Sequence, residues 1–304
     1  MLSHSQKYDE QVNVILGEHF LGGTLLDGDR RISDRRISDP QIFKKTLVFD
    51  LDETIGHFKQ LYCLYQIIIR ILNRLLTQTE FNELIDLYPE FFRVGIFSIF
   101  ELLYRKKKQK IIDGLYIYTN NKCDGDWVKM ITAYIDSKVC PGESLFDDHI
   151  LAFKIRNRIV EIRRTTETKT YADLIRCLML PEEETEICFI DNTEYTKMCN
   201  NKVYYILPRP YYHLLKKAEI MRRFFHLSIL SFTDKKRVET EFKTICCEVS
   251  NKHTIQTIDA TKKIMYYVRE FLLIRKIIVP RSNKTRRISR KDTRQMRCSR
   301  KERR

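Results

Sequence analysis

The chain has 304 residues, of which 43% are hydrophobic, and it carries a formal net charge of +15. This apolar fraction supplies a core for about two domains, or for one domain of roughly 200 residues with additions, and it excludes a wholly disordered protein. The longest apolar stretch, residues 61–76, contains two arginines and falls short of the roughly 18 uninterrupted residues of a membrane span, so we expect no membrane partner. Nine cysteines without Cys-x-x-Cys pairs, and no signal peptide, favour an intracellular location, cytoplasmic or nuclear.

Residues 1–40 are predicted to form a poorly packed, flexible segment. They hold four of the nine glycines and two copies of Arg-Arg-Ile-Ser, which end at Ser33 and Ser38. An arginine two and three residues before a serine resembles a basophilic-kinase site, and Ser289 stands in a third copy near the other end. The alternative, which we favour, is a solvated linker of alternating charge.

The apolar stretch 46–49 runs into two aspartates that lie one residue apart, Asp50 and Asp52. This pattern is typical of a buried parallel strand that ends at an active-site edge. Alternate side chains of a strand share a face, so both carboxylates can enter one pocket where open α/β sheets bind ligands. Two close carboxylates repel each other unless a cation lies between them, and Mg²⁺ is the natural occupant.

The Asp-x-Asp-x-Thr pattern also predicts a reaction. Asp50 would be the nucleophile that takes a phosphoryl group, and Asp52 would protonate the leaving oxygen and later activate water. A bare pair of aspartates fits an ordinary acidic turn about equally well. The segments that follow favour the catalytic interpretation.

Apolar residues at helical spacing predict a helical insertion over 58–90, with Pro89 near its end, and then a second amphipathic helix over 94–108. The next strand, 111–118, leads to Thr119 and Asn120. A hydroxyl at a strand end, just before a helix amino terminus, is well placed to hold a phosphate oxygen.

Alternating apolar and polar residues in 149–155 and 158–163 predict a β-hairpin. Residues 186–190 form a fourth predicted strand, which ends on Asp191 and Asn192, and 203–207 form one more. The pattern over 211–280 is helical, and no glycine follows Gly142, which excludes a glycine-rich phosphate loop there. Residues 281–304 hold 12 Lys and Arg against two acids and are predicted to be a disordered basic tail.

Four motifs recur in a known order along residues 44–210: Asp50-Leu-Asp-Glu-Thr54, Arg93-Val-Gly95, Tyr118-Thr119 and Phe189-Ile-Asp-Asn192. On these motifs the chain resembles the haloacid dehalogenase (HAD) superfamily, and within it the branch of RNA polymerase II carboxy-terminal-domain phosphatases. The resemblance implies an α/β fold with a HAD-like Rossmannoid parallel sheet over 41–210. The apolar spacing adds to this fold a helical insertion after the first strand and a C-terminal helical region. The composition also resembles that of large DNA virus proteins, which would act in a host cell.

The resemblance implies a role for each matching residue. Asp50 would be the nucleophile and Asp52 the general acid and base. Thr119 and Asn120 would bind the phosphoryl group, and Lys169 would neutralise its charge and orient Asp50. The implied reaction is a phosphatase reaction on a phosphoserine or phosphothreonine protein.

The implied cofactor is Mg²⁺, held by Asp50, the Asp52 carbonyl and Asp191, with Asn192 assisting. The lysine register departs from the branch, where the lysine directly precedes an Asp-Leu pair. Here Ala172 holds that place, so Lys154 stays an alternative to Lys169. The insertion also looks helical where the branch has β structure, so phosphorylated polymerase tails are not implied as substrates.

A nucleic-acid-binding protein is the main alternative from another class. The basic tail, 281–304, could bind phosphates through counterion release, although no aromatic residue follows Phe271 for base stacking. The tail would equally suit nuclear localisation or an acidic partner. Combined with the catalytic residues, it suggests a phosphatase of polynucleotide ends.

Overall fold

The computed structural model describes residues 13–16, 43–123, 125–245 and 258–274, and these belong to one compact unit. The basic tail, the predicted end of order at Pro280, and the three serines in the Arg-Arg-Ile-Ser copies lie outside the described residues. None of the helices in the described part is long and apolar enough to cross a membrane.

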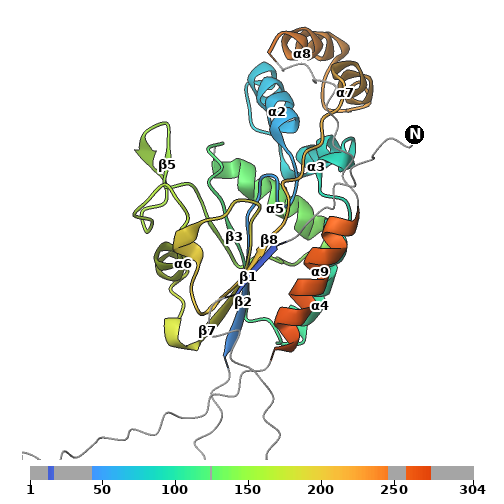
Figure 1. The fold of residues 1–304 in the computed structure, drawn as a ribbon. Helices are drawn as coiled ribbons and strands as arrows, with labels where there is room; N and C mark the ends of the chain where they lie inside the picture. Colours follow the sequence, from blue (N-terminus) through green and yellow to red (C-terminus); the bar gives the residue numbers. More distant parts are fainter. Residues whose placement is uncertain (1–12, 17–42, 124, 246–257, 275–304) are drawn as a thin grey trace, which may run out of the picture. The chain divides into compact units, whose positions relative to one another are not determined.

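A six-stranded sheet with the order β1-β8-β7-β2-β3-β4 forms the centre of the unit (Figure 1). Five strands are parallel: β2 (Lys44–Phe49), β3 (Gly114–Tyr118), β4 (Asp148–Ile150), β7 (Thr185–Ile190) and β8 (Val203–Leu207). The predicted α/β fold with a Rossmann-like parallel sheet is therefore confirmed. Four of the parallel strands, β2, β3, β7 and β8, are mostly buried apolar stretches, as in other parallel sheets, whereas the short edge strand β4 is partly exposed.

The strand register brings the ends of three motifs together. Phe49 of β2 pairs with Ile190 of β7 on one side and with Ile117 of β3 on the other. Asp50 and Asp191, the next residues of the two strands, are therefore neighbours at the carboxyl edge of the sheet. This edge is where open α/β sheets bind ligands.

Helices cover both faces of the sheet. Leu47 and Phe49 of β2 lie in a core that also contains residues of α4 (Ile96–Lys108), α5 (Gly125–Val139) and α9 (Ile258–Leu273). Val48, between them, lies in a second core with α6 (Tyr171–Leu178). Successive side chains of a strand point to opposite faces, so the apolar sequence of β2 requires a helical layer on each side.

The segment after β2 is helical, as predicted. It contains α2 (Lys59–Leu72) and α3 (Gln78–Asp86), followed by the 3-10 turn η1 (Pro89–Phe91). The predicted C-terminal helical region is also confirmed within the described residues, as α7 (Lys217–Phe224), α8 (Phe232–Ile245) and α9. Helix α8 packs on α2, whereas α9 returns to the sheet beside β8 (Figure 1).

Two predictions need correction. Residues 148–150 form β4, parallel to β3, and the predicted hairpin shrinks to β5 (Lys154–Ile155) and β6 (Arg158–Ile159). Alternation marks a half-exposed strand but does not identify its partner. Within the segment predicted to be flexible, Asn13–Leu16 forms β1, antiparallel to β8. Three apolar residues after an asparagine are too short a signal, and the edge of β8 supplies the pairing partner.

Candidate active site

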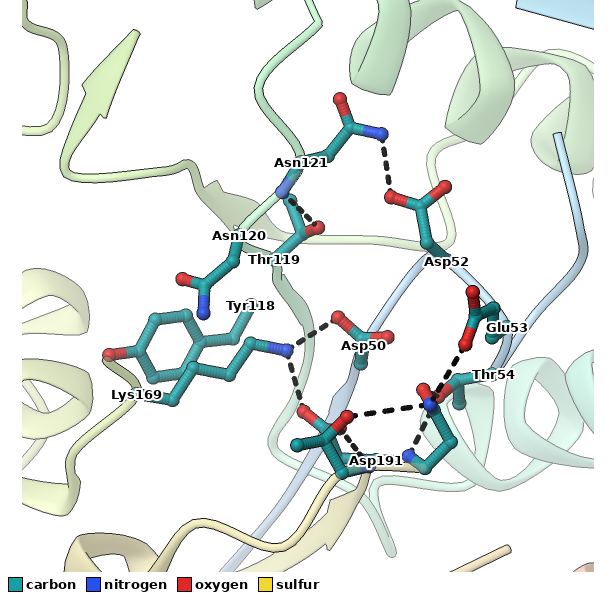
Figure 2. Close-up of polar contacts among 12 residues, drawn as sticks. Asp50, Asp52, Glu53, Thr54, Tyr118, Thr119, Asn120, Asn121, Lys169 and Asp191 are labelled. Atoms are coloured by element: carbon teal, nitrogen blue, oxygen red, sulfur yellow. Dashed lines mark hydrogen bonds and ion pairs between the residues drawn. The ribbon is translucent and has the colours of Figure 1, made fainter. Parts of the chain in front are cut away.

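Lys169 joins the ends of the two central strands. Its Nζ donates to Asp50 Oδ1 at 2.5 Å and to Asp191 Oδ2 at 2.6 Å (Figure 2). The lysine is 1% exposed, whereas Asp50 keeps 6% of its surface exposed. The second oxygen of Asp50 accepts no hydrogen bond from the described residues, so one face of this carboxylate stays available to a ligand.

The charge on Lys169 is fixed by its neighbours. Burial alone would lower the pKa of the ammonium, but the Asp191 and Asp50 carboxylates outweigh burial and raise it. The aromatic rings of Tyr118, Phe189 and Tyr195 also surround Nζ, with centroids 5.6, 5.8 and 5.5 Å away. The lysine is therefore a permanent cation at the base of the site.

A local motif explains how Lys169 reaches this position. Thr170 caps α6 by accepting from the backbone N–H of Asp173 at 3.0 Å. The Asp173 carboxylate accepts in turn from the Thr165 hydroxyl at 2.8 Å, which ties the preceding loop to the helix. Helix capping thus holds the loop that ends in Lys169.

Asp52 points away from the pair that Asp50 and Lys169 form (Figure 2). Its Oδ2 accepts a hydrogen bond from Asn121 Nδ2 at 2.6 Å. Burial and the charge of Asp50 raise the pKa of Asp52 to about 7. A carboxyl group with that pKa can hold or release a proton near neutral pH, as a general acid and base must.

The end of β3 supplies the third side of the site. Thr119 is completely buried, and its hydroxyl oxygen accepts from the backbone N–H of Asn121 at 3.0 Å. The Asn120 side chain lies between Arg164, which donates to its oxygen at 2.8 Å, and the Tyr195 hydroxyl at 3.2 Å. The structure thus brings the two predicted phosphate-binding residues to this edge, with the Asn120 amide already hydrogen-bonded.

Sequence reasoning assigned no role to Asn121 or Arg164. Asn121 directly follows the predicted phosphate-binding pair, and its contact with Asp52 depends on how the loop after β3 turns. Arg164 is 2% exposed and lies in an irregular loop, where no periodic pattern marks a residue as buried. The sequence signal for Asn121 is its amide side chain, which stands just after a predicted strand end.

The turn after the aspartates is held by Arg93, from the predicted Arg-Val-Gly motif. Its guanidinium donates to the carbonyls of Thr54 at 2.6 Å and of Glu53 at 2.8 Å. Gly95, two residues on, is the N-cap of α4 and has a φ of 80°, a conformation that favours glycine. This motif therefore supports the turn rather than contacting the carboxylates.

The alternative lysine, Lys154, lies elsewhere. It belongs to the half-exposed hairpin strand β5, and its Nζ stands 5.1 Å from the centroid of the neighbouring Phe153 ring. Lys169 is the lysine that contacts Asp50. The structure thereby places the two candidates in different environments.

The oxygen donors at this edge fit a magnesium ion. The carboxylates of Asp50 and Asp191 share one ammonium, which leaves excess negative charge and hard oxygen ligands. Within the described ranges, no group of three or more His, Cys, Asp or Glu side chains could hold a metal. The predicted set includes only two such side chains, because its third ligand is a backbone carbonyl.

Asn192, predicted to assist the metal, bonds to the turn after β2. Its side-chain oxygen accepts from the Thr54 hydroxyl at 2.9 Å, and its backbone N–H donates to the same hydroxyl oxygen at 3.0 Å. Asp191 is held at its other oxygen by the backbone N–H of Thr193 at 2.8 Å. Asn192, just after β7, therefore holds the turn that follows β2 and contains Thr54.

A cavity of about 240 Å³ opens beside Asp52. It lies between the start of the helical insertion and the loop that leads into α5. No family model, curated protein or solved structure matches this chain. Its function is therefore inferred from the geometry of this edge of the sheet.

Proposed function

We propose that the chain is a magnesium-dependent phosphate monoester hydrolase of the haloacid dehalogenase type, which works through an aspartyl-phosphate on Asp50. The observation that carries the proposal is the single ammonium of Lys169 in contact with both Asp50 and Asp191. An anionic carboxylate can attack an anionic phosphoryl group only when positive charge offsets their repulsion. A simple buried ion pair would not require a third carboxylate at Asp52.

The two steps of the reaction follow from these residues. An oxygen of Asp50 bonds to phosphorus as the bond between phosphorus and the leaving oxygen breaks. The leaving oxygen takes the proton of Asp52. Asp52, now ionised, accepts a proton from water. The water oxygen then bonds to phosphorus and the bond to Asp50 breaks, which releases inorganic phosphate. A pKa of about 7 suits Asp52 for both roles.

Asp50, Asp191 and the Asp52 carbonyl would hold the magnesium ion, which supplies positive charge at the phosphoryl oxygens when bound. Thr119 and Asn120, at the end of β3, would orient the phosphoryl group. The buried contact of Lys169 would hold Asp50 directed towards that group.

Hydrolysis of 4-nitrophenyl phosphate in the presence of Mg²⁺ tests the proposal. We expect Asp50→Asn to abolish turnover, because an amide is not a nucleophile here, and Lys169→Met to lower kcat by about 100-fold or more, because an uncompensated anion repels phosphate. Asp52→Asn should greatly weaken turnover. The matched controls are the exposed Asp148→Asn and the alternative lysine, Lys154→Met, both with wild-type rates. Full activity of Asp50→Asn would refute the proposal.

The substrate is a separate question. The family resemblance points to phosphoserine or phosphothreonine in a protein. A panel of phosphopeptides and of oligonucleotides with 3′ or 5′ phosphates, with and without Mg²⁺, separates this substrate class from polynucleotide ends. Hydrolysis of oligonucleotides alone would favour the alternative that uses the basic tail.

A further inference from the structure

The cavity beside Asp52 lies on the side of the site where the leaving group must depart. The Asp52 carboxylate is part of its wall and points away from Lys169 (Figure 2). A proton donor has to lie within hydrogen-bond reach of the oxygen that it protonates. Whatever is attached to that oxygen must therefore occupy the space next to Asp52. Its lining includes Asp52, His57, Phe58, Tyr62, Cys123 and Trp127.

The walls of this cavity are mainly aromatic and apolar. Phe58 and Trp127 are each 1% exposed, so packing fixes their rings. Tyr62 meets Trp127 edge to face, with centroids 4.9 Å apart and an interplanar angle of 70°. A ring that enters such a cavity gains apolar burial and edge-to-face contacts, which a short aliphatic group cannot make.

The charges around the cavity argue against a second anionic group on the leaving side. Asp52 and Glu53 line it, opposed by the exposed Lys59, and no arginine is among the lining residues. His57 directs Nδ1 at the carbonyl oxygen of His213, 2.8 Å away, so this nitrogen carries a proton and donates. These groups suit an uncharged leaving group.

We propose that the cavity binds the aromatic ring of an aryl phosphate monoester, as in a phosphotyrosyl side chain. This inference rests on the proposed function. In the first step the phosphorus–phenolic oxygen bond breaks, phosphorus bonds to Asp50, and the proton of Asp52 passes to the phenolic oxygen, which leaves as phenol. A phosphoserine would place only one methylene carbon next to Asp52 and would leave the aromatic walls without a ring to contact.

Two peptides of one sequence, with phosphotyrosine or phosphoserine at the same position, test the inference on the full-length protein with Mg²⁺. We expect kcat/KM to be at least about 10-fold higher for phosphotyrosine, in line with the discrimination that apolar pockets achieve. Free O-phosphotyrosine and 4-nitrophenyl phosphate show whether a peptide is needed. Cleavage of these small esters but not of the peptide would overturn the phosphotyrosyl part and leave the aryl preference.

A variant that narrows the cavity provides the second test. Cys123→Leu adds volume at the wall, whereas Cys199→Leu makes the same change at an exposed cysteine outside the cavity. We expect Cys123→Leu to lower kcat/KM for the phosphotyrosine peptide by about 10-fold, mainly through KM, and to change phosphoserine cleavage by less than about twofold. Equal losses on both peptides would overturn the inference.

Inhibition of the wild-type protein gives a readout that does not depend on a variant folding. Phenylphosphonate should inhibit at a concentration about 10-fold lower than methylphosphonate, because only the former carries a ring. Equal inhibition by both would contradict an aromatic subsite. Efficient cleavage of phosphoserine with no preference for phosphotyrosine would refute the aromatic subsite but leave the proposed phosphatase activity standing. Absence of hydrolysis of every ester would refute both the subsite and the phosphatase activity.

Discussion

Arg164 shows how one buried side chain can organise a site from outside it. Its guanidinium donates to the carbonyls of Thr119 at 3.3 Å and Leu151 at 2.8 Å, at the ends of β3 and β4. It also donates to the carbonyls of Glu167 at 3.0 Å and Thr168 at 3.2 Å, directly before Lys169. The rigid fork of an arginine spreads its donors over both chain segments, a geometry that the compact ammonium of a lysine does not reproduce.

We expect Arg164→Lys to lower kcat for 4-nitrophenyl phosphate by about 10-fold to 100-fold with a smaller change in KM, because the loop that carries Lys169 would shift relative to Asp50. The neighbouring Arg163→Lys is the matched control, since Arg163 donates to the Cys177 carbonyl on α6. Steady-state kinetics on both variants, with thermal melting to confirm folding, make the comparison. Identical kinetics of the two variants would contradict the positioning role.

At the scale of single elements, the helical insertion is stabilised by its own sequence. Thr77 caps α3 by accepting from the backbone N–H of Glu80, while Glu80 accepts from the backbone N–H of Thr77 at 2.8 Å. Arg74 adds two contacts to the same carboxylate, at 2.6 and 2.8 Å. This capping box fixes where the second insertion helix begins, although no residue in it reaches the active site.

We expect Thr77→Ala to lower the free energy of unfolding by about 1 kcal/mol, the usual cost of a lost N-cap. Hydrogen bonds from Arg74 and Thr77 lower the pKa of Glu80 from 4.5 to about 2. Because the folded state lowers this pKa, the stabilisation is full above pH 4.5 and is lost as the pH falls towards 2. Denaturant unfolding at several pH values should show a shallower acid loss for Glu80→Gln. Thr240→Ala, in the exposed part of α8, is the control.

At the scale of the whole molecule, the last described helix, α9, packs against the sheet. Phe271 of α9 is completely buried, and Glu270 accepts a hydrogen bond from the Tyr204 hydroxyl of β8 at 2.9 Å. Lys45, at the start of β2, donates to the carbonyls of Phe271 at 2.6 Å and Ile274 at 2.6 Å. The Lys45 ammonium stabilises the carboxyl end of α9, as cations do at helix carboxyl ends. This contact fixes a helix more than 200 positions away in the sequence against the strand that precedes Asp50.

We expect Phe271→Ala to lower the free energy of unfolding by about 3 to 5 kcal/mol, since it opens a cavity in the core. Leu273→Ala, on the same helix but 80% exposed, should change it by less than about 0.5 kcal/mol. Chemical denaturation of both variants provides the measurement. A small effect of Phe271→Ala would show that α9 is not part of the cooperative unit.

Much of the architecture follows from local sequence patterns. The apolar stretches that become β2 and β7 end directly in Asp50 and Asp191, and the apolar spacing after Phe58 gives two helices. Such patterns are readable because each element must bury an apolar face with its own period. They did not identify β1, and they merged β4 with the hairpin, because pairing partners are chosen by the rest of the sheet.

The candidate site is also in part predictable from the sequence and in part determined by the fold. The sequence alone determined which acids stand at strand ends, because a charge directly after a buried strand is visible in the chain. Only the tertiary structure decided that Lys169, and not Lys154, contacts Asp50, and that Asn121 holds Asp52. These contacts join residues 119 and 69 positions apart, and their geometry depends on irregular loops held by Arg164 and by the cap of α6. Loop conformation follows from the packing of its surroundings, not from a repeating pattern of side chains.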